Sequence, residues 1–221
     1  MREDSLEIYS ALRVRPPLIL RADGRGFRKA LDGSKKPYDE HFARSMAAAS
    51  RSFMEDSGLS PTLAFLFSDE VNLLFLDLPF NGRLEKLDSI AASYLSSALS
   101  LNRGRILAMD CRALPLCAGE IGEYLSQCQD EAWRNHVFSY GFYALVEEGR
   151  THGEAMGLLR GMKESQIHEM LFERGLNLAH NPAWQRRGVL LYREDGSLVE
   201  EWAPPLFRSM EGVALLGRLI S

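Results

Sequence analysis

Short apolar runs alternate in the first half of the chain with longer segments whose apolar residues recur at helical spacing. The segments 39–58 and 84–101 are predicted to be amphipathic helices, and the first of them ends at Gly58. Four apolar runs bounded by turn residues are predicted to be strands: 17–23, 62–67, 71–78 and 105–115. Because only Ser68-Asp69-Glu70 separates the second and third runs, those two strands are expected to form a hairpin.

This order, β-α-β-β-α-β, is the split pattern of a ferredoxin-type antiparallel sheet with two helices on one face. From 119 to 176 the chain is predicted to be mostly helical, and the apolar runs on either side of Asp195-Gly196 are expected to form a small hairpin. The predicted fold class is therefore α+β. A palm-like core over 1–118 carries a helical extension with the hairpin over 119–221, packed on the core. No linker separates the two parts, so a single domain is the alternative. Residues 1–15 are predicted to form a short helix.

Composition and charge narrow the class of protein. Of the 221 residues, 46% are hydrophobic and 25% are charged, which excludes a disordered or collagen-like chain. The net charge is −4, so binding of nucleic acid would require a local basic patch. No apolar run is long enough for a membrane span, and the charged N-terminus lacks the apolar core of a secretory signal. A cytoplasmic protein without membrane association is expected, with Cys111, Cys117 and Cys128 as free thiols.

Three carboxylates stand at the ends of predicted strands. Asp23 ends the first strand, and Asp69 and Glu70 lie in the predicted hairpin turn. Since the first and third strands of a split βαβ sheet are neighbours, these groups are expected to converge. Clustered carboxylates repel one another unless a cation holds them, and Mg²⁺ prefers a few carboxylates with water and phosphate oxygens. Two such ions serve phosphoryl transfer in palm-type nucleotidyltransferases and cyclases, whereas the competing interpretation is two ordinary turns.

Several further groups are candidates for binding phosphate. The Gly24-Arg25-Gly26 turn can present backbone N–H groups, and Lys35-Lys36-Pro37 is a short basic loop before a helix. Arg83 and Lys86 lie within one turn of a predicted helix start and are expected to face the same pocket. For each group the alternative is a solvated loop or a surface charge pair.

Taken together, the motifs resemble those of the tRNA-His guanylyltransferase superfamily. R-A-D-G-R-G-F, K-K-P-Y-D, S-D-E-V-N-L-L-F and M-D-C-R-A-L-P follow one another at the spacing found in that family. E-A-W-R-N-H, L-L-R-G-M-K, H-E-M-L-F-E-R-G-L-N and P-A-W-Q-R-R-G-V-L agree in the second half. The resemblance covers roughly residues 15–195 and is to the archaeal and bacterial guanylyltransferase-like branch of these 3′-to-5′ polymerases.

The resemblance implies a two-metal nucleotide site. Asp23, the Gly24 carbonyl and Asp69 would hold two Mg²⁺ ions, and Glu70 would complete the catalytic acids. The residues implied to contact the nucleotide are Asp23, Gly24, Arg25, Gly26, Phe27, Lys36, Asp39, Ser68, Asp69, Arg83, Lys86 and Arg112. The implied substrates are ATP, which activates the 5′ phosphate, and GTP or another nucleoside triphosphate, which is added.

The second half implies a tRNA partner. Family motifs contain the implied tRNA-binding residues Asn135, His136, Lys163, Arg186 and Arg187, and also His168, Asn177 and Trp184, for which packing roles are the alternative. The resemblance also implies a homo-oligomer, specifically a homotetramer.

The chain departs from the eukaryotic branch at two places. It has W-R-N-H-V-F-S-Y where those members have an asparagine-rich run, and Ile167 where they have a lysine. These departures favour template-dependent repair of truncated tRNA 5′ ends over dedicated tRNA-His guanylyltransferase activity. A palm-type cyclase and a non-catalytic RNA-binding module are the alternatives from other classes.

Overall fold

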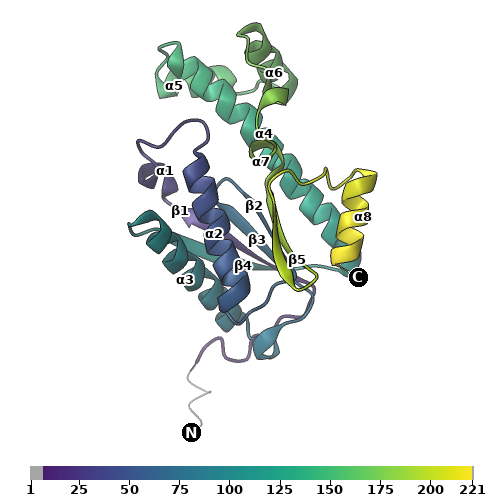
Figure 1. Ribbon diagram of the computed structural model, residues 1–221. Coiled ribbons are helices and arrows are strands. Elements are labelled where there is room, and N and C mark those ends of the chain that lie inside the picture. Colours follow the sequence, from purple (N-terminus) through teal and green to yellow (C-terminus); the bar gives the residue numbers. More distant parts are fainter. Residues whose placement is uncertain (1–6, 221) are drawn as a thin grey trace.

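The computed structural model describes residues 7–220, which form a six-stranded antiparallel sheet covered by helices on both faces (Figure 1). The strand order is β4-β1-β3-β2-β5-β6, and every neighbouring pair is antiparallel. The strands are β1 (Leu18–Arg25), β2 (Leu63–Phe67), β3 (Glu70–Phe75), β4 (Ala108–Pro115), β5 (Val189–Glu194) and β6 (Ser197–Glu201). The expected α+β class and the βαββαβ order are confirmed.

Alternation of side chains along the strands produces two cores, one on each face of the sheet. Helices α2 (Glu40–Asp56) and α3 (Leu84–Arg103) cover one face, where Phe53 and Leu95 pack against Leu20 and Leu73 of the strands. Helices α4 (Ile121–Glu147) and α8 (Met210–Leu219) cover the other face. The core on that face includes Ile19, Phe65, Leu74, Leu125, Phe207 and Leu216.

The second half of α4 extends beyond the sheet and carries a small helical lobe, seen in Figure 1 away from the strands. Helices α5 (His152–Leu159) and α6 (Glu164–Glu173) pack against it there through a third apolar cluster that contains Val137, Leu145 and Ile167. Short helices complete the chain: α1 (Phe27–Ala30), η2 (Pro79–Gly82), η3 (Ala118–Glu120), η4 (Leu178–His180) and α7 (Ala183–Arg187). No helix within residues 7–220 is long and apolar enough to cross a bilayer.

Two local predictions differ from the structure. The predicted C-terminal hairpin forms, but it also extends the main sheet, since β5 pairs with β2 along Leu63–Leu66. The predicted N-terminal helix is wrong for residues 7–15, which form turns and an isolated bridge between Arg13 and Arg83; residues 1–6 lie outside the described part. The proposed boundary near residue 118 stays a prediction, although the sheet itself draws strands from both sides of it.

Candidate active site

Carboxylates converge at the end of β1, on the face of the sheet that α4 covers. Asp23 lies directly opposite Glu70 of β3 and directly opposite Asp110 of β4. Since residues opposite one another in antiparallel strands point to the same face, the three side chains share that face. Asp69 lies in the β2–β3 turn, and its pKa is raised by burial and by the nearby charge of Asp23. Asp23 therefore lies opposite Glu70 and near Asp69, and the assignment of the three as catalytic acids stays a prediction.

Gly24 joins the two acidic segments. Its backbone N–H donates to the Asp69 carbonyl at 3.1 Å, which ties the end of β1 to the hairpin turn. A Cβ atom at position 24 would lie 2.7 Å from Asp69 Oδ2 and 2.5 Å from Phe27 Cδ2, so only glycine fits without displacement of these neighbours. The carboxylate of Asp69 therefore packs directly against the glycine backbone.

Burial and mutual repulsion perturb these acids. The pKa of Asp69 is raised by burial and by the charge of Asp23, against a stabilising hydrogen bond from Ser68 Oγ at 3.1 Å. The pKa of Glu70 is also raised by burial, and the hydrogen bond from Asn72 opposes that shift. Raised carboxylate pKa values at the end of a strand indicate negative charge that the protein itself does not fully compensate.

The acidic end suits a divalent cation bound together with a phosphate. Asp23 and Asp69 supply hard oxygen donors, which Mg²⁺ prefers, and the uncompensated repulsion between them is what a cation would relieve. Within residues 7–220, no group of three or more His, Cys, Asp or Glu side chains forms a metal cage by itself. Substrate phosphate oxygens and water would therefore complete the coordination, as is usual for Mg²⁺.

A basic residue and an unpredicted acid flank this end. Arg112, a predicted nucleotide contact, lies on β4 with Nη2 3.3 Å from Asp110 Oδ1 and 4.0 Å from Asp23 Oδ2. Asp110 was not identified from the sequence. The sequence does contain a signal for Asp110. It stands two residues before Arg112 in the M-D-C-R motif, and residues two apart on a strand point to the same face.

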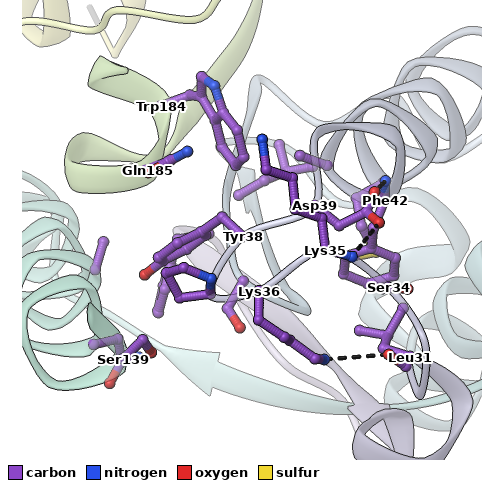
Figure 2. Close-up of a pocket in the computed structure, with 18 of the residues that line it drawn as sticks. Leu31, Ser34, Lys35, Lys36, Tyr38, Asp39, Phe42, Ser139, Trp184 and Gln185 are labelled. Carbon is purple, nitrogen blue, oxygen red and sulfur yellow. Dashed lines mark hydrogen bonds between the residues drawn. The ribbon is translucent and has the colours of Figure 1, made fainter. Parts of the chain in front are cut away.

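A pocket of about 190 Å³ opens beside the hairpin turn (Figure 2). The loop before α2, the β2–β3 turn, α4 and α7 line it, together with residues of α2, β2 and β5. The walls combine apolar groups with hydrogen-bonding groups, as is typical of sites for small molecules. Its lining includes Lys36, Tyr38, Asp39, Phe42, Ser68, Asn135, Ser139, Trp184 and Gln185. Ser68 adjoins Asp69, so the pocket and the carboxylates are contiguous.

Tyr38 occupies the centre of this pocket wall (Figure 2). Its ring lies 5.5 Å from the ring of His136 and 6.0 Å from that of Tyr140, both on α4, and 5.9 Å from Trp184 on α7. The sequence offered no local signal for Ser139 or Gln185, because their positions depend on how α4 and α7 pack against the loop.

Four other predicted nucleotide contacts lie at or beside the pocket, and two of them make hydrogen bonds within the protein. Asp39 caps α2, with its carboxylate accepting from the backbone N–H groups of Phe42 at 2.9 Å and Lys35 at 3.1 Å. Partial burial works against ionisation of Asp39, but these two hydrogen bonds prevail and lower its pKa. Lys36 lines the pocket and donates from Nζ to the Leu31 carbonyl at 3.2 Å. Arg25 and Gly26 are exposed beside Asp23.

The structure limits one predicted nucleotide contact to the backbone and corrects the placement of two others. The Phe27 side chain is 2% exposed and packs edge-on against Phe42 in the core, so only its backbone can reach a ligand. Arg83 and Lys86 begin α3 beyond the other end of β3, where Arg83 pairs with Glu7 and Lys86 lies over the Phe80 ring. The length of β1 separates that end from Asp23, roughly 17 Å at the usual rise per residue. These two side chains do not face the pocket of their own chain.

The predicted tRNA-binding residues lie on three elements: α4, the start of α6, and α7. His136 is fully buried, which corrects the prediction that it contacts tRNA directly. Asn135 is exposed at the pocket rim, whereas Lys163 is exposed at the start of α6 in the helical lobe. Arg186 and Arg187 are half-buried on α7 and donate to the carbonyls of Asn181 at 3.1 Å and Pro204 at 3.4 Å, respectively.

The remaining second-half residues have packing roles in the described structure. Ile167 is 4% exposed in the apolar cluster of the helical lobe, with Gly141 of α4 packed closely against it. Trp184 packs against the core and against Trp202, as well as lining the pocket. His168 lies 6.4 Å from the Trp133 ring, and Asn177 accepts from the backbone N–H of Ala179 as the cap of η4. The three cysteines are free.

An antiparallel sheet with two helices on one face, and with approaching carboxylates at the end of β1, defines the palm class shared by nucleotidyltransferases and cyclases. The sequence profile of the tRNAHis guanylyltransferase family matches residues 2–121. The chain belongs to this family of nucleotidyltransferases.

Individual relatives agree with this assignment. The tRNA(His) guanylyltransferase of Neurospora crassa is 28% identical over 195 residues, which cover 80% of this chain and 66% of that protein. The chain thus spans just under two thirds of that relative. A bacterial tRNA(His) guanylyltransferase-like protein in complex with ATP has a similar fold, with a TM-score of 0.81 at 19% identity over 95% of this chain and 93% of that one. For the Saccharomyces cerevisiae tRNA(His) guanylyltransferase the TM-score is 0.77 at 22% identity, over 90% and 95% of the two chains.

Proposed function

We propose that this chain is a 3′–5′ nucleotidyltransferase that adds nucleotides to the 5′ end of tRNA. The observation that carries the proposal is the approach of Asp23 and Asp69 at the end of β1, contiguous with a pocket of mixed polarity. Membership of the tRNAHis guanylyltransferase family supports it. Bacterial proteins of the same fold are known in complex with ATP and with GTP, which supports a nucleoside triphosphate as the ligand of this pocket.

In this proposal Asp23, the Gly24 carbonyl and Asp69 hold two Mg²⁺ ions. When bound, the ions neutralise phosphate charge and stabilise the attacking and leaving oxygens. Arg112, 4.0 Å from Asp23, adds positive charge at the same end of the sheet. Ser68, which adjoins Asp69, and Lys36, in the pocket lining, would contact the triphosphate. The protein thus contributes position and charge, which dominate phosphoryl transfer.

The reaction transfers a nucleotide in two steps. ATP first adenylylates a 5′-monophosphorylated tRNA and releases pyrophosphate. The 3′ hydroxyl of the incoming nucleotide then attacks the 5′ phosphorus, the bond to AMP breaks, and the hydroxyl proton passes to solvent. With a 5′-triphosphorylated RNA the first step is unnecessary and pyrophosphate is the leaving group. The pocket orients the nucleotide for in-line attack, which lowers the entropic part of the barrier.

We further propose that the enzyme repairs truncated tRNAs in a template-dependent manner. Ile167 stands where eukaryotic members have a lysine, and its side chain is enclosed by apolar residues of the helical lobe. An isoleucine offers no hydrogen bond and no charge to a phosphate. Base pairing with the opposing acceptor-stem nucleotide is then left as the discriminator for the incoming nucleotide. Dedicated addition of guanosine to tRNA-His is the second outcome that the experiment distinguishes.

The decisive experiment is incubation with intact and 5′-truncated tRNAs, ATP and each of the four nucleoside triphosphates. Repair by whichever nucleotide pairs with the opposing base would support the proposal. Equal addition of guanosine opposite adenosine and opposite cytidine would overturn templated repair and favour dedicated guanylyl transfer. Cyclisation of nucleotide without RNA would favour a cyclase, and RNA binding without any turnover would favour a binding module.

Three further proposals follow from the family. The tRNA contacts assigned to Asn135, Lys163, Arg186 and Arg187, the homotetramer and the cytoplasmic location all stay predictions. Light scattering of the purified protein would test the homotetramer.

A further inference from the structure

A buried chain of hydrogen bonds leads from α4 to the acidic end of the sheet. The Tyr124 hydroxyl of α4 donates to Asn72 Oδ1 at 2.6 Å, and Asn72 Nδ2 donates to Glu70 Oε1 at 2.7 Å. Asn72 is fully buried in the middle of β3, and Glu70 lies opposite Asp23. The chain therefore ends on one of the three predicted catalytic acids.

The direction of these hydrogen bonds is determined by chemistry. An ionised Glu70 carboxylate can only accept, so Asn72 must present its NH₂ group to it. The Asn72 carbonyl oxygen then needs a donor, which the Tyr124 hydroxyl supplies. A flipped amide would place the Asn72 carbonyl oxygen against a carboxylate, which is repulsive. Tyr124 therefore fixes the orientation in which Asn72 holds Glu70.

The surroundings of Asn72 argue against a role in packing alone. On the same face of the sheet, the next position on β3 is Leu74 and the position opposite on β2 is Phe65, both fully buried, whereas the position opposite on β1 is Arg21. On the side of Leu74 and Phe65, an apolar side chain would fit without the cost of burying a polar amide. Buried polar groups that are fully hydrogen-bonded fix one arrangement of their neighbours. The arrangement fixed here is that of the Glu70 carboxylate.

We propose that Tyr124 and Asn72 are positioning residues that hold the Glu70 carboxylate beside Asp23 at the acidic end of the sheet. This inference rests on the proposed function, in which Glu70 is a catalytic acid. It also assigns α4 a direct role at the site, because the same helix lines the nucleotide pocket through Asn135 and Ser139.

The test is a double-mutant cycle between Tyr124→Phe and Glu70→Gln, with addition of a nucleotide to 5′-triphosphorylated RNA as the readout. Tyr124→Phe removes one hydroxyl and is expected to lower kcat about tenfold, as for loss of a hydrogen bond to a buried polar group, with KM for the nucleotide unchanged. In the Glu70→Gln background the same change is expected to have no further effect, because Tyr124 acts through Glu70. Asn72→Asp, which replaces the donor by an acceptor, is expected to lower kcat at least as much.

The matched control is Tyr94→Phe. Its hydroxyl makes a hydrogen bond of 2.8 Å with Ser52 Oγ on the other face of the sheet, so its loss tests general destabilisation. The control is expected to keep wild-type kcat. An equal loss in Tyr94→Phe, an undiminished kcat in Tyr124→Phe, or a full additional loss in the Glu70→Gln background would each overturn the positioning role.

Binding of Mn²⁺ in the presence of GTP, followed by electron paramagnetic resonance, gives a second readout that needs no turnover. Tyr124→Phe is expected to weaken Mn²⁺ binding about threefold when Glu70 is present and not at all in the Glu70→Gln background. If the wild-type protein shows this Mn²⁺ pattern but adds no nucleotide, the proposed function fails while the positioning role stands. Mn²⁺ binding that is absent from the wild type, or insensitive to Tyr124→Phe, would overturn the positioning role.

Discussion

At the scale of single residues, the site depends on close contact between Gly24 and Asp69. The glycine backbone donates to the Asp69 carbonyl, while the Asp69 carboxylate lies against the glycine Cα. The next glycine, Gly26, has a different reason for its identity: its φ is +69°, and a Cβ there would meet open space. Gly24 is therefore required by the close approach of its neighbours, whereas Gly26 is required by its positive φ.

Substitution at these two glycines should have different consequences. Gly24→Ala is expected to displace Asp69 or Phe27, to destabilise the protein by about 1–3 kcal/mol and to lower nucleotide addition about a hundredfold. Gly26→Ala is the matched control and should cost about 1 kcal/mol through its positive φ, with a much smaller effect on activity. Urea unfolding and turnover assays measure both. Equal activity losses in the two variants would contradict the assigned role of Gly24.

Asp69→Asn separates charge from shape. The variant is expected to lose nucleotide addition at least a hundredfold, because a cation ligand is removed. Its Tm at pH 7 should equal or exceed that of the wild type, since the raised pKa of Asp69 shows that the ionised carboxylate disfavours the folded state. This loss of folding free energy is present at pH values above the pKa of Asp69 in the folded protein, and it disappears as Asp69 is protonated. The Tm advantage of the variant should therefore shrink as pH falls towards 4, and calorimetry can measure this change. Near-wild-type activity of Asp69→Asn would exclude the role of Asp69 as a metal ligand.

At the scale of elements, His136 of α4 packs against Tyr38 of the pocket wall and against the segment before α7. The imidazole is fully buried between Tyr140 and Tyr38, with ring centroids 4.7 and 5.5 Å away, and its Nε2 lies 3.1 Å from Asn181 Nδ2. Burial, with a contribution from Arg186, lowers the pKa of His136 to about 4. The ring is therefore neutral in the folded protein at pH 7, and its role is to hold Tyr38 in place.

This buried histidine predicts a loss of stability in acid. Between pH 6.5 and about 4 the unfolded chain protonates His136 while the folded chain does not, so folding loses up to about 1.4 kcal/mol per pH unit from this residue. His136→Phe should remove that part of the pH dependence, whereas His180→Gln, at an exposed position, should not. Urea unfolding at pH 7, 6 and 5 measures the difference. Parallel pH dependences for wild type and His136→Phe would refute the assignment.

Local patterns predicted the strands and helices of the first half well, because each has a clear period and a turn at its end. They could not predict that β5 pairs with β2, since Leu63 and Tyr192 are brought together only by the fold. The error for Arg83 and Lys86 has a topological cause. The chain leaves β3 at the end opposite the hairpin turn, so α3 must begin there. His136 was misassigned because α4 is covered on more than one side, which obscures its apolar face.

At the scale of the whole molecule, the net charge of −4 means that the proposed binding of tRNA would require local positive charge. Replacing Arg186 and Arg187 by alanine should weaken tRNA binding. It should also reduce the slope of the logarithm of the binding constant against the logarithm of salt concentration by roughly one to two units. Binding of free GTP should change little. Because both side chains also hydrogen-bond to backbone carbonyls, circular dichroism must first show that the variant is folded. An unchanged salt slope would assign both residues to structure alone.

The pocket lies where the loop before α2, the β2–β3 turn, α4 and α7 meet, and this has a consequence for how the protein is made. A chain synthesised from its N-terminus exposes the first three segments to folding before Trp184 and Gln185 leave the ribosome. The wall that they form is therefore completed after the other three segments, and β6 and α8 follow it in the chain. A nucleotide that needs this wall should favour the folded state by mass action. Under the proposed function, ATP and GTP would then be both the substrates and stabilising ligands of the folded protein.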